Sequence, residues 1–237
     1  MAHKQPELLT KLINSLDNPA AGFVIHLDKK ADPSLFQKDL HKSNCHFIKN
    51  PIEVFWGGFS QVKATLMGME EAVEHFDFNY FVYLSGQDFP IKSNNYISNF
   101  IEQQSGKEFI DYYYIPESSH TFNTRTRIDR YYWMDRKEDF FRKAFNKIGS
   151  FVKGRKAPYN FIAIGGCAYF GFTSSLVNYI RTFLRENKKY TRYFKYTVCA
   201  DEAFFHTLVY NSKFKDARGV VRCVCGLCCP RFRIRHR

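Results

Sequence analysis

The sequence lacks two features, and their absence limits the classes of protein to which the chain can belong. Its sequence contains no run of about 18 apolar residues, which excludes a membrane-spanning helix. The segment from Met1 to Glu7 has no apolar stretch behind a basic one, so we expect no secretory signal. Apolar residues make up 45% of the 237 residues, aromatic residues 18% and charged residues 24%. This composition excludes a disordered chain, a collagen and a small disulfide scaffold, and it predicts a soluble globular protein.

The common nucleotide and metal motifs are also missing. The chain has neither a G-x-G-x-x-G nor a Walker loop, and isolated glycine pairs such as 57–58 and 165–166 are more typical of tight turns. It has no D-x-D pair, with which many sugar-nucleotide enzymes hold a divalent cation. The eight histidines are dispersed, without an H-E-x-x-H pair. The sequence therefore predicts no metal site in the body of the chain.

The excess of positive charge is concentrated near the end of the chain. Lys and Arg total 35 against 23 Asp and Glu, a formal net charge of +12. Six arginines and no acid follow Asp216, so half of the excess lies in this last segment. Four of the seven cysteines lie there too, as C-x-C-x-x-C-C, which is not the paired C-x-x-C pattern of zinc knuckles. We expect residues 218–237 to form an irregular tail, and a zinc site is the alternative.

Hydrophobic periodicity predicts helices that alternate with short strands. Such alternation favours an α/β fold with a mostly parallel central sheet flanked by helices. Apolar runs rich in β-branched or aromatic residues predict strands at 22–27, 46–48, 80–84 and 168–172. Helical periodicity predicts helices at 6–16, 34–41, 60–76 (with Ser60 as its cap), 94–104, 137–151, 174–186 and 201–210.

Two polar segments follow predicted strands. Asp28 ends the first strand, and Ser85–Asp88 follow the strand at 80–84. Ligands of open α/β sheets bind beyond the carboxyl ends of the strands. We therefore expect both segments to face a cleft.

A pair of acids and an aromatic stretch supply the other candidates. Asp201 and Glu202 stand at the predicted start of the last helix, where most carboxylates only complement the helix dipole. Adjacent side chains point in different directions, so one acid can cap while its neighbour faces the cleft. The stretch 112–133 mixes Arg with Tyr, a composition shared by carbohydrate-binding surfaces, single-stranded nucleic-acid-binding surfaces and ordinary solvated faces.

Five segments together carry a more specific signal. They are VIHLDKK at 24–30, VFWGGFSQV at 54–62, YLSGQDFPIK at 83–92, GGCAYF at 165–170 with LVNYI at 176–180, and ADEAFFHTL at 200–208. In order and spacing they resemble the core-2/I-branching N-acetylglucosaminyltransferase family, which includes peptide O-xylosyltransferases. The resemblance covers residues 3–214, and its W-G-G and F-F-H-T details look nearer to the xylosyltransferase branch.

The resemblance implies a fold and a reaction. It implies a GT-A-like nucleotide-sugar-binding fold, here over residues 1–217, and an inverting, metal-independent glycosyltransferase. Xylose or N-acetylglucosamine would move from a UDP-sugar to an acceptor hydroxyl, and Glu202 takes the family's general-base position. By the same resemblance, the donor side would include Asp28, Trp56, Ser85 and Asp88, and the acceptor side Gly166, Cys167, Arg127, Arg130 and Tyr131.

The resemblance also sets expectations for partners. These are a nucleotide-sugar donor and a glycan or protein hydroxyl acceptor, with no metal, no other cofactor and no nucleic acid. Cys45, Cys167 and Cys199 stand singly, as in a reducing compartment, so we expect a cytoplasmic enzyme compatible with peripheral membrane association. The tail matches nothing in the family, whose diphosphate-binding Arg and Lys lie downstream, and only two residues precede His3. We therefore expect a fragment shortened at both ends.

Two alternatives remain open at this point. A nucleic-acid-binding module would use the tail and the stretch 112–133, and its affinity would fall steeply with salt. A degenerate, non-catalytic transferase would bind UDP without turnover.

Overall fold

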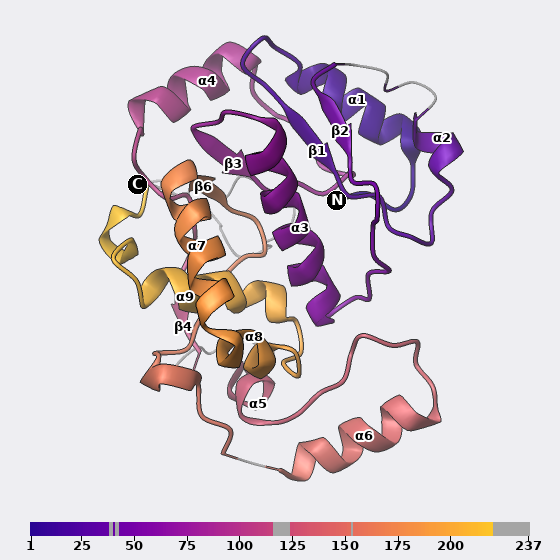
Figure 1. Cartoon of the computed structure of the whole chain (residues 1–237), viewed down its shortest axis with the longest axis vertical. Helices are drawn as coiled ribbons and strands as arrows, with labels where there is room; N and C mark the ends of the chain where they lie inside the picture. Colours follow the sequence, from indigo (N-terminus) through magenta and orange to yellow (C-terminus); the bar gives the residue numbers. More distant parts are fainter. Residues whose placement is uncertain (38–39, 41–42, 116–123, 153, 220–237) are drawn as a thin grey trace, which may run out of the picture.

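Figure 1 shows a computed structural model of the chain, which describes residues 1–37, 40, 43–115, 124–152 and 154–219. Its strands are β1 (Phe23–Ile25), β2 (Cys45–Phe47), β3 (Tyr80–Val82), β4 (Tyr113–Tyr114), β5 (Ile164–Gly165) and β6 (Gly171–Thr173). Its α-helices are α1 (Pro6–Leu16), α2 (Pro33–Gln37), α3 (Phe59–His75), α4 (Asn94–Gln103), α5 (Thr124–Asp129), α6 (Phe140–Phe151), α7 (Ser174–Glu186), α8 (Lys188–Phe194) and α9 (Phe204–Tyr210). Three 3₁₀ turns complete it: η1 (Pro158–Asn160), η2 (Ala200–Glu202) and η3 (Lys215–Ala217).

The long helices lie close to where the sequence predicts them. Helices α1 and α7 have the predicted bounds, and α1 begins with a proline, whose missing N–H costs nothing in the first turn. The capping role predicted for Ser60 is wrong, because α3 begins after Gly58. The Ser60 hydroxyl instead accepts the N–H of Phe55 at 2.9 Å and so holds the loop that leads into α3.

Two hydrophobic clusters hold the fold together. The smaller one packs Leu9 and Ile13 of α1 against Ile25 of β1. The larger one includes Met69 of α3 and Phe172 of β6, both fully buried. Burial of each such side chain contributes about 2 kcal/mol, so these contacts dominate the attachment of the helices to the strands.

The predicted mostly parallel central sheet is not what the described residues form. Of their three strand pairs, β1–β2 is parallel, whereas β3–β6 and β4–β5 are antiparallel. Between β3 and β6 the chain passes through α4, β4, α5 and α6 and returns in the opposite direction (Figure 1). The direction of a strand depends on where this long excursion returns, which no local hydrophobic period encodes.

The first two residues connect the ends of β1 and β3. Ala2 forms a parallel bridge with Leu27, just after β1. The Met1 amino group donates to the carbonyl of Leu84 at 2.8 Å, and the Gly86 N–H donates to the carbonyl of Met1 at 2.7 Å. The segments that follow β1 and β3 therefore lie side by side, and the cleft that the sequence predicts at Asp28 and Ser85–Asp88 stays a prediction.

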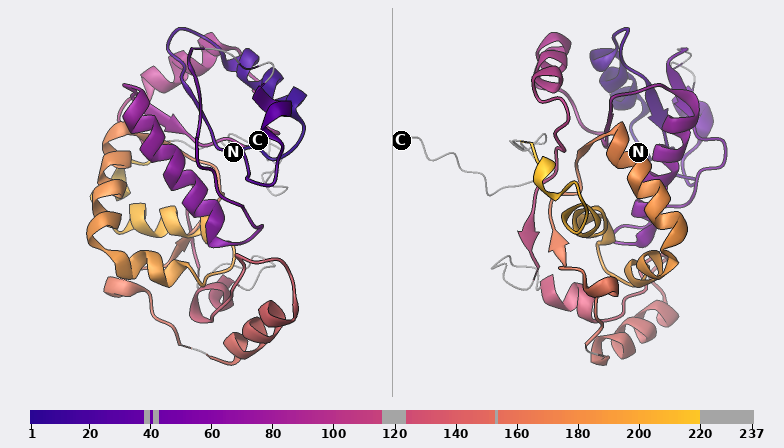
Figure 2. Two further views of the ribbon diagram at one scale, coloured as in Figure 1. Left: turned by 45° about the vertical axis from the view of Figure 1, so that its right-hand side comes forward. Right: turned by 60° about the vertical axis from the view of Figure 1, so that its left-hand side comes forward.

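Helix α6 lies at one end of the molecule, and α1, α2 and α4 lie at the other (Figures 1 and 2). It begins three residues later than predicted, because the Asp139 side chain accepts the N–H of Arg142 and caps the helix there. Throughout the described ranges, no helix has the length and apolar character needed to cross a bilayer.

Candidate active site

The two predicted acids lie in a turn of their own. Asp201 and Glu202 belong to η2 and not to the last helix, which begins only at Phe204. The turn starts after Cys199, whose φ of 49° is left-handed and whose N–H donates to the carbonyl of Gly57 at 2.8 Å. The turn, rather than the helix dipole of α9, therefore sets the directions of the two carboxylates.

Glu202 points outward and meets an arginine. Its side chain is 38% exposed, and Oε2 accepts a hydrogen bond from Nη2 of Arg127 at 2.6 Å. Burial of the Arg127 guanidinium opposes its charge, but the Glu202 carboxylate outweighs burial and raises the pKa of Arg127. Tyr113 of β4 also contacts this guanidinium. The structure thus joins the predicted base to one of the predicted acceptor-side residues.

Asp201 points the other way, into the protein. Its Oδ2 accepts a hydrogen bond from Nε2 of Gln61 at 3.3 Å, and its Oδ1 is buried without a hydrogen-bond partner in the described part of the chain. Burial first and the neighbouring Glu202 charge second raise the pKa of Asp201 to about 7. The two neighbours therefore diverge, as predicted, with Glu202 as the accessible one.

The loop after β5 lies against this turn. The Gly166 N–H donates to the carbonyl of Glu202 at 2.9 Å. A Cβ atom on Gly166 would lie 2.2 Å from the carbonyl oxygen of Asp111 and 2.5 Å from Nε2 of His206, so only glycine fits. His206 is fully buried beneath the loop, and burial lowers its pKa to about 3. Cys167, next in the chain, is half-buried.

The W-G-G segment also contacts the turn. Gln61 connects the two, because its Oε1 accepts the Gly57 N–H at 2.8 Å while its Nε2 donates to Asp201. Trp56, at the tip of the segment, is 74% exposed. Sequence reasoning assigned no role to Gln61, although it falls within the VFWGGFSQV motif, because nothing local shows that its amide reaches residue 201.

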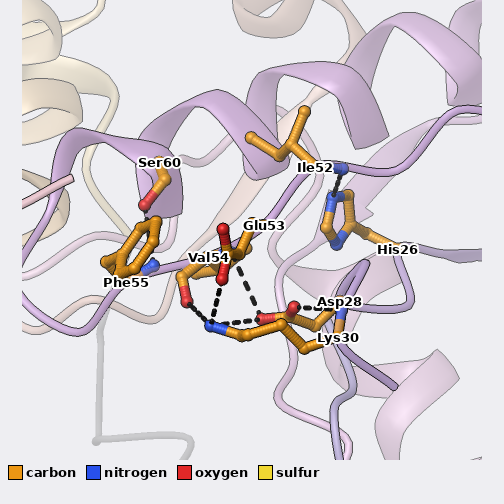
Figure 3. A network of polar contacts seen from close by, with 8 residues as sticks. All are labelled: His26, Asp28, Lys30, Ile52, Glu53, Val54, Phe55 and Ser60. Atoms are coloured by element: carbon orange, nitrogen blue, oxygen red, sulfur yellow. Dashed lines mark hydrogen bonds and ion pairs between the residues drawn. The ribbon is translucent and has the colours of Figure 1, made fainter. Parts of the chain in front are cut away.

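Asp28 holds the first part of that segment in place (Figure 3). It is 5% exposed, its Oδ1 accepts the Lys30 N–H at 2.9 Å, and its Oδ2 accepts the Val54 N–H at 3.2 Å. The Lys30 ammonium lies 3.6 Å from Oδ2 and donates to the carbonyl of Val54 at 2.7 Å. Nearby, Nε2 of His26 accepts the Ile52 N–H at 3.2 Å. Asp28 thus shapes the loop that carries Trp56.

The Ser85–Asp88 segment is a tight turn. Oδ2 of Asp88 accepts the Ser85 N–H at 2.7 Å, and the Gln87 N–H donates to the Ser85 hydroxyl at 3.2 Å. Burial raises the pKa of Asp88, against the effect of a hydrogen bond from Tyr169. The Tyr169 ring lies 5.9 Å from that of Tyr83, whose pKa burial and the Asp201 charge both raise. The charges of both Asp88 and Asp201 therefore act on Tyr83.

Arg130 and Tyr131 make other contacts. Arg130 lies 3.9 Å from Asp129, and the Tyr131 ring stacks on the Arg155 guanidinium at 4.4 Å. The Tyr131 N–H donates to the carbonyl of Gly149 in α6 at 3.4 Å. None of these contacts reaches Glu202. Three basic or aromatic residues were predicted on the acceptor side, and of these the structure places Arg127 in contact with Glu202.

The structure tests neither the predicted tail nor the predicted metal-free reaction. Residues 220–237, which hold the cysteine cluster and most of the tail arginines, lie outside the described residues. Within the described residues, the one group of three side chains that could hold a metal ion is His46, Glu71 and His75, from β2 and α3. It includes no predicted site residue, and the predicted metal-free reaction stays a prediction.

Comparison with known proteins identifies the family. The family model described as Core-2/I-Branching enzyme matches residues 1–222. The chain is 23% identical to xylosyltransferase 2 of Rattus norvegicus over 211 residues, covering 86% of the chain and 23% of the relative. It is 24% identical to xylosyltransferase oxt of Drosophila melanogaster (86% and 23%) and 25% identical to xylosyltransferase sqv-6 of Caenorhabditis elegans (87% and 25%).

The chain spans about a quarter of the length of these curated relatives. The family model covers all of the described residues, including η2, the W-G-G segment and the loop after β5. The resemblance seen in the five sequence segments is thereby confirmed: the chain belongs to the core-2/I-branching enzyme family of glycosyltransferases.

Proposed function

We propose that this chain transfers a sugar from a UDP-sugar to an acceptor hydroxyl, with inversion and without a metal, and that Glu202 is the general base. Membership of the family and the xylosyltransferase names of its relatives support sugar transfer and favour xylose as the donor sugar. The observation that carries the assignment of the base is the outward Glu202 carboxylate paired with Arg127.

The proposed step is a single displacement. The acceptor hydroxyl attacks the anomeric carbon of the donor while Glu202 takes its proton, and the bond from that carbon to the UDP oxygen breaks. A carboxylate has room for several hydrogen bonds, so the contact with Arg127 leaves capacity for the hydroxyl. Attack opposite the leaving group inverts the anomeric centre. Because the proposed mechanism includes no metal ion, basic side chains must stabilise the negative charge that develops on the leaving UDP.

The donor is proposed to bind along the loops that follow β1, β2 and β3. Trp56 offers an exposed indole, on which a base or sugar ring can stack. Asp28 acts through the loop that it holds, since both its oxygens already accept backbone N–H groups. Ser85 and Asp88 act likewise, as a preformed turn at the same edge.

The acceptor is proposed to approach over the Gly166–Cys167 loop, whose backbone contacts Glu202. Because no side chain fits at Gly166, the floor stays low enough for a substrate to reach the carboxylate. Arg127 positions the base from below. Arg130 and Tyr131 are proposed to border the acceptor more remotely, through the segment that connects to α6.

The test is Glu202→Gln, which keeps the shape of the side chain and removes its basicity. Transfer from UDP-xylose or UDP-N-acetylglucosamine should fall by about 10²–10⁴-fold, whereas UDP binding measured by calorimetry should be retained. Glu186→Gln, on the exposed side of α7, is the matched control and should leave both unchanged. Turnover that survives in Glu202→Gln would remove Glu202 from the role of base. Activity abolished by EDTA and restored by manganese would overturn the metal-free mechanism.

A further inference from the structure

Three side chains that sequence reasoning left unconnected lie together on the far part of α3. Glu71 and His75 are one helical turn apart on α3, and His46 reaches them from β2. Nε2 of His46 lies 2.7 Å from Oε2 of Glu71, and Nδ1 of His75 lies 3.7 Å from the same oxygen. The two imidazole rings are 3.7 Å apart between centroids.

This set of donors suits a divalent transition metal. One donor atom from each of the three residues lies within 4.8 Å of the other two. Imidazole nitrogens and a carboxylate oxygen bind Zn²⁺ at about 2.0–2.2 Å, commonly with three protein ligands and one open position. All three side chains are partly exposed, so solvent can supply a fourth ligand.

The hydrogen bonds around His75 favour ligation. Its Nδ1 lies 3.0 Å from the backbone carbonyl of Glu71, which can only accept, so Nδ1 carries the proton. Neutral His75 then has its lone pair on Nε2. Metal-binding histidines commonly donate their other ring N–H to a carbonyl in this way.

We propose that His46, Glu71 and His75 bind a divalent transition-metal ion, with Zn²⁺ as the preferred ion. The site is separate from the reaction. Gln61, which contacts Asp201, and His75 stand fourteen positions apart on α3, which is about 21 Å of helix rise. A bound ion would cross-link β2 to the end of α3. It would thereby hold the parallel β1–β2 pair in place on α3 and stabilise the folded protein.

Co²⁺ binding to the whole chain tests the site. Co²⁺ held by imidazole and carboxylate ligands gives visible d–d bands. Co²⁺ held by the thiolates of the tail would also give charge-transfer absorption in the near ultraviolet. The spectrum therefore distinguishes binding at the proposed site from binding by the tail cysteines. The parent chain should bind one ion with thiolate-free spectra, and Zn²⁺ should displace it and raise Tm. His75→Ala and Glu71→Gln should each weaken this binding at least tenfold, with unchanged circular dichroism.

The control is His3→Ala, which removes an exposed imidazole elsewhere and should leave the binding intact. Sugar transfer should be the same in His75→Ala as in the parent chain, so failure of the metal site and failure of the proposed function are distinguishable. Thiolate spectra alone, or equal affinity in the parent and His75→Ala, would overturn the proposal.

A second, independent feature is the outward apolar face of α6. Its four exposed apolar side chains, together with Val152 directly after the helix, are between 47% and 77% exposed. At 100° per residue, the four on the helix span about 100° of its circumference. The helix attaches by its other side, where Gly149 is buried against Tyr131. The exposed side chains are Phe140, Phe141, Ile148, Phe151 and Val152.

The border of this face is basic. Lys143 and Lys147 flank it along the helix, and Lys137 and Lys156 lie exposed near its ends. The exposed acid Glu138 is already paired with Lys143 at 3.2 Å. A helix with an apolar face bordered by lysines, placed at one end of the molecule (Figure 2), suits the surface of an anionic bilayer.

We propose that α6 lies in the interface of an anionic membrane with its three phenylalanines inserted. Sedimentation with vesicles of phosphatidylcholine alone or with a quarter phosphatidylglycerol tests this. The chain should bind the anionic vesicles, and the double variant Phe140→Ser, Phe151→Ser should bind at least tenfold more weakly. Leu35→Ser, which removes an exposed side chain from α2, is the control and should bind normally.

Equal binding by the double variant and the parent, or no binding by the parent, would overturn the proposal. A parent chain that is dimeric in solution, and that the double variant makes monomeric, would show that the face joins two copies instead. Light scattering after size exclusion decides between these outcomes.

Discussion

Replacement of Asp201 by Asn should make the protein more stable, and more so at higher pH. Burial and the Glu202 charge raise the pKa of Asp201 from 3.8 to about 7 in the folded protein. The unfolded chain therefore releases this proton at lower pH than the folded chain does, and folded stability is lost as pH rises from about 4 to 7. Asn keeps the shape and carries no charge, so it escapes this cost.

The magnitude follows from about 1.4 kcal/mol for each pKa unit. A raise of about 3 units destabilises the native protein by about 4 kcal/mol at pH 8 and by about 2 kcal/mol at pH 5. Asp201→Asn should therefore unfold at higher urea concentration than the parent, with a stability gain about 2 kcal/mol larger at pH 8 than at pH 5. Circular dichroism during urea titration at both pH values measures this.

The control is Asp77→Asn, which removes an exposed carboxylate and should give no such pH-dependent gain. An equal gain for Asp201→Asn at both pH values would refute the reasoning, because it would show that Asp201 ionises normally. A loss of stability at pH 8 would show that the hydrogen bond from Gln61 outweighs burial of the charge.

Three further predictions concern the same site. Gly166→Ala should destabilise the protein by about 2 kcal/mol, because its Cβ would lie 2.5 Å from Nε2 of His206, whereas Gly68→Ala, with its nearest contact at 3.7 Å, should be neutral or stabilising in thermal melts. Arg127→Lys should keep the charge but lose the planar contact with Glu202, so that transfer falls about tenfold while UDP binding holds, and equal turnover would contradict this. His206 has a folded pKa of about 3, so the unfolded chain takes up the proton first as pH falls, and the contribution of His206 to stability should drop by about 2 kcal/mol between pH 7 and pH 5, opposite in sign to that of Asp201. In urea titrations, the stability of His206→Asn relative to the parent should therefore rise by about 2 kcal/mol between pH 7 and pH 5. A difference that does not change with pH would argue against a buried neutral ring.

Much of the local structure follows from the sequence. The apolar positions of α1 and α7 recur at the helical period, and the Pro6 start of α1 fits its first turn, so these helices appear with the predicted bounds. The four predicted strands lie within a few residues of β1, β2, β3 and β6, whereas β4, β5, α5 and α8 were not predicted. The family followed from five motifs in series, and the match to residues 1–222 confirms it.

Other features could not be predicted because they depend on contacts between distant segments. The last helix was expected to begin at Asp201, but the left-handed Cys199 and its bond to Gly57 set a separate turn there. Gln61 reaches Asp201 across 140 positions of sequence. His46 likewise meets Glu71 and His75 only because β2 packs beside α3.

The sequence by itself determined most of the long helices, the positions of four of the strands and the family, since hydrophobic period and motif order are local properties that survive without coordinates. Only the tertiary structure decided that two of the three described strand pairs run antiparallel, and that Glu202 faces outward to Arg127 while Asp201 faces inward. The strand directions and the directions of the two carboxylates both depend on how segments that are far apart in the sequence pack together. The charges and the burial that act on a carboxylate come from neighbouring residues, and many of these neighbours belong to segments that are distant in the sequence.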